Sequence, residues 1–192
     1  MTADRRFSSA LFVVAAALRE LPSPSMIIGG VAVIAAGVPR QTIDIDATVL
    51  GRTSDLDSVL ATFAGHGITP RISDAREFAR SRQILLLKHD ASGVTIEVSF
   101  AWLPFEEEAL RLAEEVDLDG LALRIARPED LIIYKAAAWR DRDRSDTTLV
   151  LHLPQIDLPR VRELVREIGS ALDDPGRIEA FDEIVGRVRA SG

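Results

Sequence analysis

The segment from Met26 to Val49, MIIGGVAVIAAGVPRQTIDIDATV, constrains the fold more than any other part of the chain. A short apolar run precedes Gly29-Gly30, small apolar residues follow, and Asp44 and Asp46 then interrupt a second apolar run. A strand made only for packing avoids such acids, because a buried carboxylate must be paired, protonated or bound to a metal. The order therefore predicts a strand, a glycine turn that holds a phosphate, a short helix and a metal-binding strand.

Residues 42–49 alternate between polar and apolar side chains, which is typical of a half-buried strand. The polar face comprises Thr42, Asp44, Asp46 and Thr48, and the apolar face comprises Ile43, Ile45, Ala47 and Val49. Residues two apart on a strand point to the same side, so the two carboxylates can converge on one site. Carboxylates are suitable ligands for Mg²⁺. Enzymes of phosphoryl and nucleotidyl transfer commonly use two divalent ions, which stabilise the attacking and leaving oxygens. The alternative is a pair of exposed acids at a strand end.

A third acid, Glu97, lies within a predicted β-hairpin. Residues 83–89 and 94–101 are apolar, strand-like runs joined by the turn residues 90–93. Glu97 alternates with apolar residues in the second run. It would complete a metal site with Asp44 and Asp46 if the two strands are neighbours.

Lys135 is placed among apolar residues on a helix that we expect to begin at Pro128 and to run toward Asp146. Its ammonium either snorkels to solvent or faces a triphosphate. On a continuous helix Asp146 would point within roughly 20° of Lys135, and Asp143 about 80° away. For Arg142 and Arg144 we favour a solvated face on which they form salt bridges.

Gly29-Gly30 also has two interpretations. The pair forms either an ordinary tight turn or a turn at the start of a helix whose backbone amides bind phosphate.

Composition indicates an ordinary globular protein, with 47% hydrophobic and 28% charged residues among 192. The absence of Cys excludes disulfides and thiolate chemistry and fits a cytoplasmic protein. The Leu11–Leu18 run is too short to span a bilayer, so we expect an amphipathic first helix and no membrane partner. The net charge of −7 argues against nucleic-acid binding over the whole surface. Much of that charge lies in residues 106–119, which we expect to form a solvated helix, so a local basic surface remains open.

Four motifs together resemble the nucleotidyltransferase superfamily, and most of all its AbiEii-like branch, which includes toxins of bacterial toxin–antitoxin systems. They are IIGGVAVIAAG, TIDIDATV, VTIEVSF and RPEDLIIYKAAAWRDRDRSD, within roughly residues 24–150. The resemblance implies an α+β fold, with a nucleotidyltransferase-like mixed sheet flanked by helices and a C-terminal helical annex. We expect residues 1–126 to form the core with its N-terminal helix and residues 127–192 to form the helical part, packed together as one compact unit.

The resemblance also implies roles for individual residues. Gly29 and Gly30 would hold the nucleotide phosphates, and Asp44 and Asp46 would bind Mg²⁺. Glu97 would act as base or third metal ligand, and Lys135 would contact the triphosphate. Asp143 or Asp146 would correspond to a late acidic position in the nucleotide site. Two residues depart from the family pattern: Val31 stands where many members have Ser, and Glu97 stands where Asp is frequent.

These observations predict a Mg²⁺-dependent transfer of NMP from NTP to an acceptor hydroxyl. The resemblance implies RNA such as tRNA as acceptor, a toxin role and an antitoxin protein as partner. Two alternatives stay open: a catalytically eroded binding or regulatory module, and a nucleotidyltransferase acting on a small molecule such as an antibiotic. Net acidity favours a small cationic acceptor, whereas a basic surface would favour RNA. The arginines that would form such a surface are Arg124, Arg127, Arg140 and Arg142.

Overall fold

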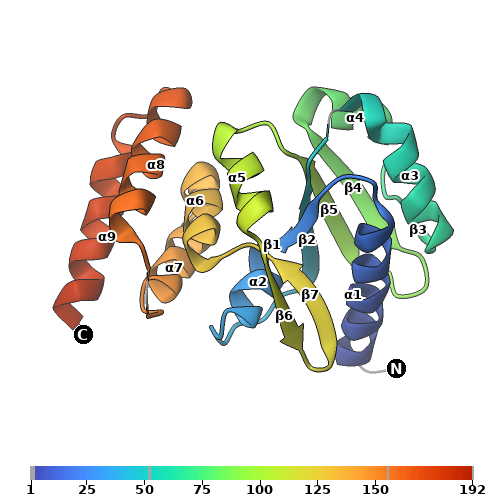
Figure 1. The fold of residues 1–192 in the computed structure, drawn as a ribbon, viewed down its shortest axis with the longest axis horizontal. Coiled ribbons are helices and arrows are strands. Elements are labelled where there is room, and N and C mark those ends of the chain that lie inside the picture. Colours follow the sequence, from blue (N-terminus) through green and yellow to red (C-terminus); the bar gives the residue numbers. More distant parts are fainter. Residues whose placement is uncertain (1–2, 52, 155, 192) are drawn as a thin grey trace. The chain divides into compact units, whose positions relative to one another are not determined.

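The computed structural model describes residues 3–51, 53–154 and 156–191, and it forms two compact units. The first comprises Met1–Ala35 and Arg40–Ala126, and the second comprises Ala36–Pro39 and Arg127–Gly192. The first contains a mixed sheet with helices and the second contains helices (Figure 1). The expected α+β class, with a mixed sheet and a C-terminal helical part, is confirmed.

The first unit contains seven strands and five α-helices in its described part. The strands are β1 (Ser25–Ile28), β2 (Asp44–Val49), β3 (Ile68–Pro70), β4 (Ile84–His89), β5 (Thr95–Phe100), β6 (Glu114–Leu118) and β7 (Leu121–Ile125). The helices are α1 (Ala3–Glu20), α2 (Gly29–Ala35), α3 (Leu56–Gly65), α4 (Ala75–Arg82) and α5 (Pro104–Leu112). The chain leaves α1 where Pro22 and Pro24 prevent a helix from continuing.

The strand order is β3-β4-β5-β2-β1-β7-β6, which places the predicted metal strand β2 in the middle of the sheet (Figure 1). It pairs antiparallel with β1 and parallel with β5. Ile45, Ile96 and Val98 are fully buried in these two central strands. Such burial holds the β2 backbone firmly, so the alternate, polar positions of the strand have a fixed place on the sheet.

The second unit consists of α6 (Pro128–Ala138), α7 (Asp141–Val150), α8 (Leu158–Ala171) and α9 (Arg177–Ser191) within its described residues. Helix α6 packs against α7 and α8, and α9 packs against α7 and α8. Ile132, Val161, Val165 and Phe181 are buried at their apolar faces. No helix in the described ranges of the chain combines the length and apolarity needed to cross a bilayer.

The expectation of one solvated helix over residues 106–119 is wrong. Helix α5 ends at Leu112, and the acidic residues that follow form the edge strand β6, which pairs with β7. Glu106 is 2% exposed, and its carboxylate accepts hydrogen bonds from the backbone amides of Trp102 and Leu103. This acid therefore caps the start of α5, where unpaired amide groups favour a carboxylate.

A continuous helix from Pro128 to Asp146 is also wrong. Helix α6 ends at Ala138, the next residue Trp139 has a left-handed backbone with φ of 52°, and α7 begins at Asp141. The Asp143 carboxylate accepts a hydrogen bond from the Arg140 amide at 3.0 Å and so caps the new helix. Periodicity alone did not reveal the break, because neither Gly nor Pro marks it.

Strand β2 begins at Asp44 rather than at Thr42, which changes the expected apolar face at one position. Ile43 is 83% exposed, whereas Ile45, Ala47 and Val49 are buried as predicted. Thr48 on the polar face is fully buried, and its hydroxyl lies 2.8 Å from that of Ser99 on β5.

Candidate active site

Gly29 joins β1 to α2 at a place where a side chain cannot fit. Its φ is +63°, which L residues rarely adopt, and a Cβ added to it would lie 1.9 Å from Asp46 Oδ2. The sheet register explains this contact, since Ile28 at the end of β1 pairs with Asp46 on β2. The structure therefore places the Asp46 carboxylate directly against the glycine turn.

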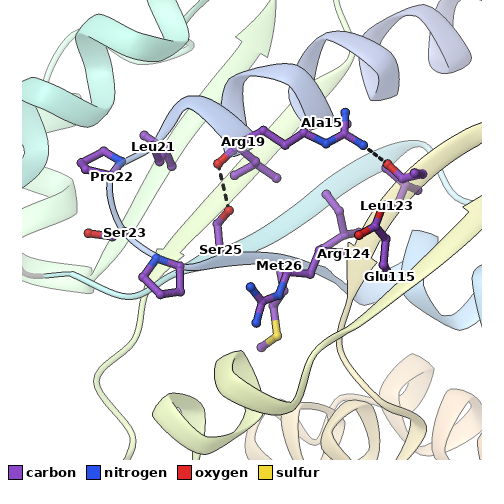
Figure 2. A pocket seen from close by; sticks show the side chains of 14 residues that line it. Ala15, Arg19, Leu21, Pro22, Ser23, Ser25, Met26, Glu115, Leu123 and Arg124 are labelled. Atoms are coloured by element: carbon purple, nitrogen blue, oxygen red, sulfur yellow. Dashed lines mark hydrogen bonds between the residues drawn. The ribbon is translucent and has the colours of Figure 1, made fainter.

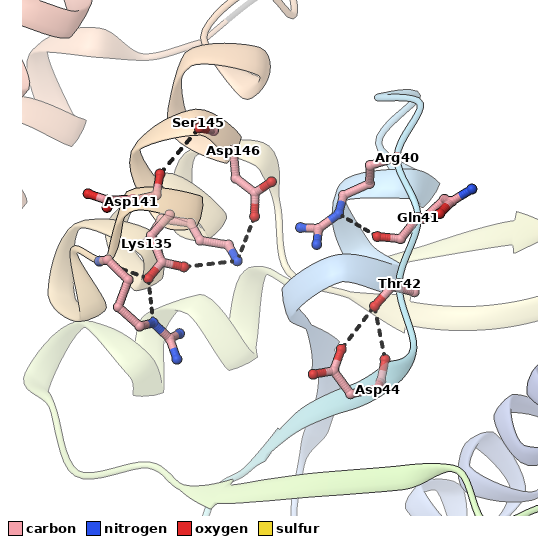
Figure 3. Close-up of polar contacts among 10 residues, drawn as sticks. Arg40, Gln41, Thr42, Asp44, Lys135, Asp141, Ser145 and Asp146 are labelled. Carbon is pink, nitrogen blue, oxygen red and sulfur yellow. Dashed lines mark hydrogen bonds and ion pairs between the residues drawn. The ribbon is translucent and has the colours of Figure 1, made fainter.

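Gly30 is enclosed in a similar way by Thr42. A Cβ on Gly30 would lie 2.5 Å from Thr42 Oγ1. The same hydroxyl donates to Asp44, at 3.0 Å from Oδ1 and 3.1 Å from the backbone oxygen (Figure 3). Thr42 thus connects the second glycine to the first acid of β2 and limits the orientations that the Asp44 carboxylate can take. Thr42 belongs to the predicted polar face of residues 42–49, where its neighbours in the sequence give no sign of this contact.

Glu97 lies directly beside Asp46 in the sheet. The parallel register of β2 and β5 pairs Asp46 with Glu97 and Asp44 with Thr95. Paired residues on adjacent strands project from the same face, at strand spacings of about 4.8 Å. The sheet therefore brings the third predicted acid to the same face as Asp44 and Asp46.

Arg71 binds Glu97 and was not anticipated from the sequence. Its guanidinium donates to Glu97 Oε1 at 2.6 Å, and the two side chains are 31% and 41% exposed. Arg71 immediately follows β3, two strands away from β5 in the sheet. Only the sheet order brings them together, so no local pattern could have revealed the pair.

The donor chemistry at this face fits Mg²⁺. Aspartate and glutamate oxygens are the hard ligands that Mg²⁺ prefers, and a site made of one or two carboxylates completed by water and substrate phosphate is usual for this ion. The glycine at position 29 leaves room for the Asp46 carboxylate that a side chain would fill. Within the described ranges no three acidic or histidine side chains already form a metal-binding group. The pair Asp44 and Asp46, rather than a complete triad with Glu97, is the arrangement observed.

Lys135, Asp143 and Asp146 form a separate charged cluster within the second unit. Lys135 Nζ lies 2.9 Å from Asp146 Oδ2 and 3.3 Å from Asp143 Oδ1 (Figure 3). Asp143 Oδ2 also accepts from Arg140 Nε at 2.7 Å. The helix break at Trp139 allows both acids to approach Lys135. On a straight helix Asp143 and Asp146 would lie about 12 and 16 Å from Lys135 along the axis, and neither could reach it.

This cluster is largely buried, with Lys135 at 12% and Asp143 at 0% side-chain exposure. Burial by itself raises the pKa of Asp143, but hydrogen bonds from Arg140 and the charges of Lys135 and Arg140 outweigh burial and hold that pKa below its usual value. The Lys135 ammonium already has two carboxylate partners. These two ion pairs account for a lysine on an apolar helix without any ligand.

A cavity of about 450 Å³ lies elsewhere in the first unit, between the end of α1 and strands β1 and β7 (Figure 2). Its lining is mostly apolar, with Arg19, Glu115 and Arg124 among the polar residues. Arg19 donates to the Ala122 carbonyl and Arg124 donates to the Leu110 carbonyl, so both guanidinium groups stabilise the fold. The lining includes neither Asp44 nor Asp46. The acidic face of β2 is therefore the stronger candidate for chemistry.

Residues 9–183 match the model of a family described as nucleotidyltransferase of unknown function (DUF6036). The chain belongs to this family. The match spans both units of the fold, and it confirms the predicted nucleotidyltransferase superfamily and the prediction of an enzyme. No curated protein matches the chain.

Several solved structures share the fold. The crystal structure of ANT(2'')-Ia in complex with adenylyl-2''-tobramycin has a TM-score of 0.58 at 19% identity, covering 86% of this chain and 99% of that chain. The solution structure of the same antibiotic-resistance factor has a TM-score of 0.52 at 18% identity, covering 99% and 96%. JHP933 from Helicobacter pylori has a TM-score of 0.52 at 13% identity, covering 97% and 89%. At these identities the likeness concerns the fold.

Proposed function

We propose that this nucleotidyltransferase transfers an NMP from an NTP to an acceptor hydroxyl and releases pyrophosphate, using the face formed by Gly29, Gly30, Asp44 and Asp46. The observation that carries the proposal is the position of the Asp46 carboxylate, which occupies the space where a side chain at position 29 would lie. It joins a backbone turn that can accommodate a phosphate to a carboxylate that can hold a cation. Neither feature alone would distinguish this site from an ordinary tight turn.

Asp44 and Asp46 would hold Mg²⁺, which supplies Lewis-acid polarisation of the phosphate to be transferred. Thr42 orients the Asp44 carboxylate through its hydroxyl. Glu97 would face the acceptor or add a ligand. Because Arg71 binds Oε1 of Glu97, an acceptor hydroxyl or a metal would use Oε2. The predicted contact of Lys135 with the triphosphate, and a nucleotide role for Asp143 or Asp146, stay predictions.

The proposed acceptor is RNA, such as tRNA, in a cytoplasmic toxin whose partner is an antitoxin protein. Support for this acceptor comes from the resemblance of the four sequence motifs to the AbiEii-like branch. A small cationic acceptor is the second candidate, and the net charge of −7 favours it, since an acidic surface attracts cations. The fold shared with an antibiotic-resistance factor is compatible with that second candidate.

The test is transfer of label from each of the four α-labelled NTPs, with Mg²⁺, to total RNA or to an aminoglycoside in parallel reactions. Labelled RNA supports the first acceptor and labelled aminoglycoside the second. Asp46→Asn should abolish transfer with little change in thermal stability, because it removes a charged ligand while keeping its shape. Asp57→Asn is the matched control, since Asp57 is a 73% exposed partner of Arg76 on the surface. Unchanged transfer by the Asp46 variant would contradict the assignment.

The non-catalytic alternative has its own measurement. A nucleotide that binds the folded state stabilises it by RT ln(1 + [L]/Kd), so a saturating NTP with Mg²⁺ raises the melting temperature of an active enzyme. An eroded module that has lost the nucleotide site shows no such shift with any of the four NTPs.

A further inference from the structure

Arg40 lies close to Gly30, the second glycine of the turn. A Cβ on Gly30 would lie 3.5 Å from Arg40 Cζ, the carbon at the centre of the guanidinium group. Arg40 is half-buried, and its Nε donates to the Gln41 carbonyl at 3.2 Å (Figure 3). The guanidinium is therefore held beside the backbone of the turn.

Two carboxylates also lie near the turn. Asp46 lies against Gly29, and Asp44 is held by the Thr42 hydroxyl that lies against Gly30. Val31, which follows the glycines, is 1% exposed and offers no side-chain donor. The Mg²⁺ proposed for Asp44 and Asp46 would offset these two charges, and a further cation beside the turn would attract the phosphate oxygens that the metal does not contact.

A guanidinium group suits that task. It is planar, always charged and carries five donors in a fork that matches two phosphate oxygens. An ammonium is a point charge that cannot bind in this bidentate manner. The structure places the Arg40 guanidinium within contact range of the Gly30 position.

We propose that Arg40 binds the polyphosphate of the nucleotide at the Gly29-Gly30 turn, where Val31 provides no donor. This assignment rests on the proposed function, since it presupposes that a nucleotide occupies the turn. It adds a binding residue from the loop between α2 and β2 to the glycines and the two aspartates. Arg40 recognises the charge of the phosphates and does not select the base.

The experiment measures nucleotide binding rather than turnover. Titration calorimetry with the α,β-methylene analogues of the four NTPs, and with the four NMPs, is done in EDTA and again in Mg²⁺. The proteins are the wild type, Arg40→Gln and Arg40→Lys. Arg40→Gln should weaken binding of the triphosphate analogue roughly 10–100-fold, the range of a charge-assisted hydrogen bond to a charged group, and binding of the NMP much less. Arg40→Lys should fall between the wild type and Arg40→Gln.

Arg82→Gln is the matched control. Arg82 is exposed at the end of α4, and the strand that follows it begins with Ile84, which pairs with Ser99. Ser99 lies at the other end of β5 from Thr95, the partner of Asp44. The control should bind every nucleotide like the wild type.

Three outcomes overturn the assignment. Arg40→Gln could bind the triphosphate analogues as tightly as the wild type, which refutes Arg40 alone and leaves the proposed function standing. It could also weaken NMP and triphosphate binding equally, as a general loosening of the site would do. A wild-type protein that binds no triphosphate refutes the proposed function and the role of Arg40 together. If Arg40→Gln melts early, the comparison of Arg40→Lys with the wild type decides, because it preserves the charge and removes the fork.

Discussion

Replacing Gly29 with Ala tests whether the glycine turn and the metal strand form one site. A non-glycine residue in the left-handed region costs about 1–2 kcal/mol. For a chain of this length that corresponds to a fall of roughly 2–8 °C in melting temperature. The added Cβ also meets Asp46 Oδ2 at 1.9 Å, and Cβ contacts under 3.0 Å are essentially never found. The oxygen must therefore move by at least 3.0 − 1.9 = 1.1 Å.

A displacement of about 1 Å in a catalytic group can lower the rate roughly 10²-fold. We therefore expect Gly29→Ala to lose at least that factor in kcat/KM for NMP transfer, measured with labelled NTP, Mg²⁺ and whichever acceptor is labelled in the test of the proposed function. Gly67→Ala is the control, because Gly67 has nearly the same φ of +68° and nothing within 4 Å of its added Cβ. It should lose similar backbone stability and keep its activity. Equal activity losses in the two variants would refute the idea that the close approach of Asp46 to Gly29 is needed for catalysis.

Three further perturbations follow from the ion pairs. If Glu97 faces the acceptor, as proposed, Arg71→Ala should lower kcat while leaving NTP binding unchanged, because it releases the Glu97 carboxylate. The melting temperature of Arg71→Ala should change little, since exposed pairs contribute about 0–1 kcal/mol. A fall in NTP affinity instead would contradict this role. The lowered pKa of Asp143 means that its charge stabilises the folded state above the ordinary value of 3.8 and that this contribution disappears as the pH falls through the lowered value. Melting of Asp143→Asn should accordingly depend less on pH in this acidic range than melting of the wild type, and parallel pH profiles would show that Asp143 contributes nothing. Asp130→Ala should destabilise the helical unit by about 3–5 kcal/mol in denaturant unfolding, because the fully buried carboxylate binds Arg127 and Arg160; a loss below about 1 kcal/mol would contradict a structural ion-pair network.

Local sequence patterns predicted the central part of the fold well. Alternation placed β2 and the hairpin of β4 and β5 within one or two residues of their observed bounds. These elements have clear periodicity and turn residues at their ends. The spacing of Gly29-Gly30 and Asp44-x-Asp46 grouped residues that the structure brings into contact.

The failures arise where contacts outside the local sequence pattern decided the structure. The acidic residues 114–118 form a strand because β7 offers a pairing partner, although their composition favours a solvated helix. The turn at Trp139 has no glycine, and the burial of Asp143 against Lys135 and Arg140 accompanies it. The sequence around Arg40 and Arg71 does not predict their contacts. Arg40 contacts the glycine turn because its loop packs there, and Arg71 reaches Glu97 because of the strand order.

The pairing of Ile28 with Asp46 has a consequence for how the site can fail. The glycine turn and both aspartates belong to one continuous antiparallel piece, β1–α2–β2, in which each half holds the other in place. A local opening that separates β1 from β2 removes phosphate and metal binding in a single event, rather than weakening one of them. The amide of Ile28 should therefore exchange with solvent deuterium at the same opening rate as that of Asp46. A nucleotide that slows exchange at one should slow it equally at the other.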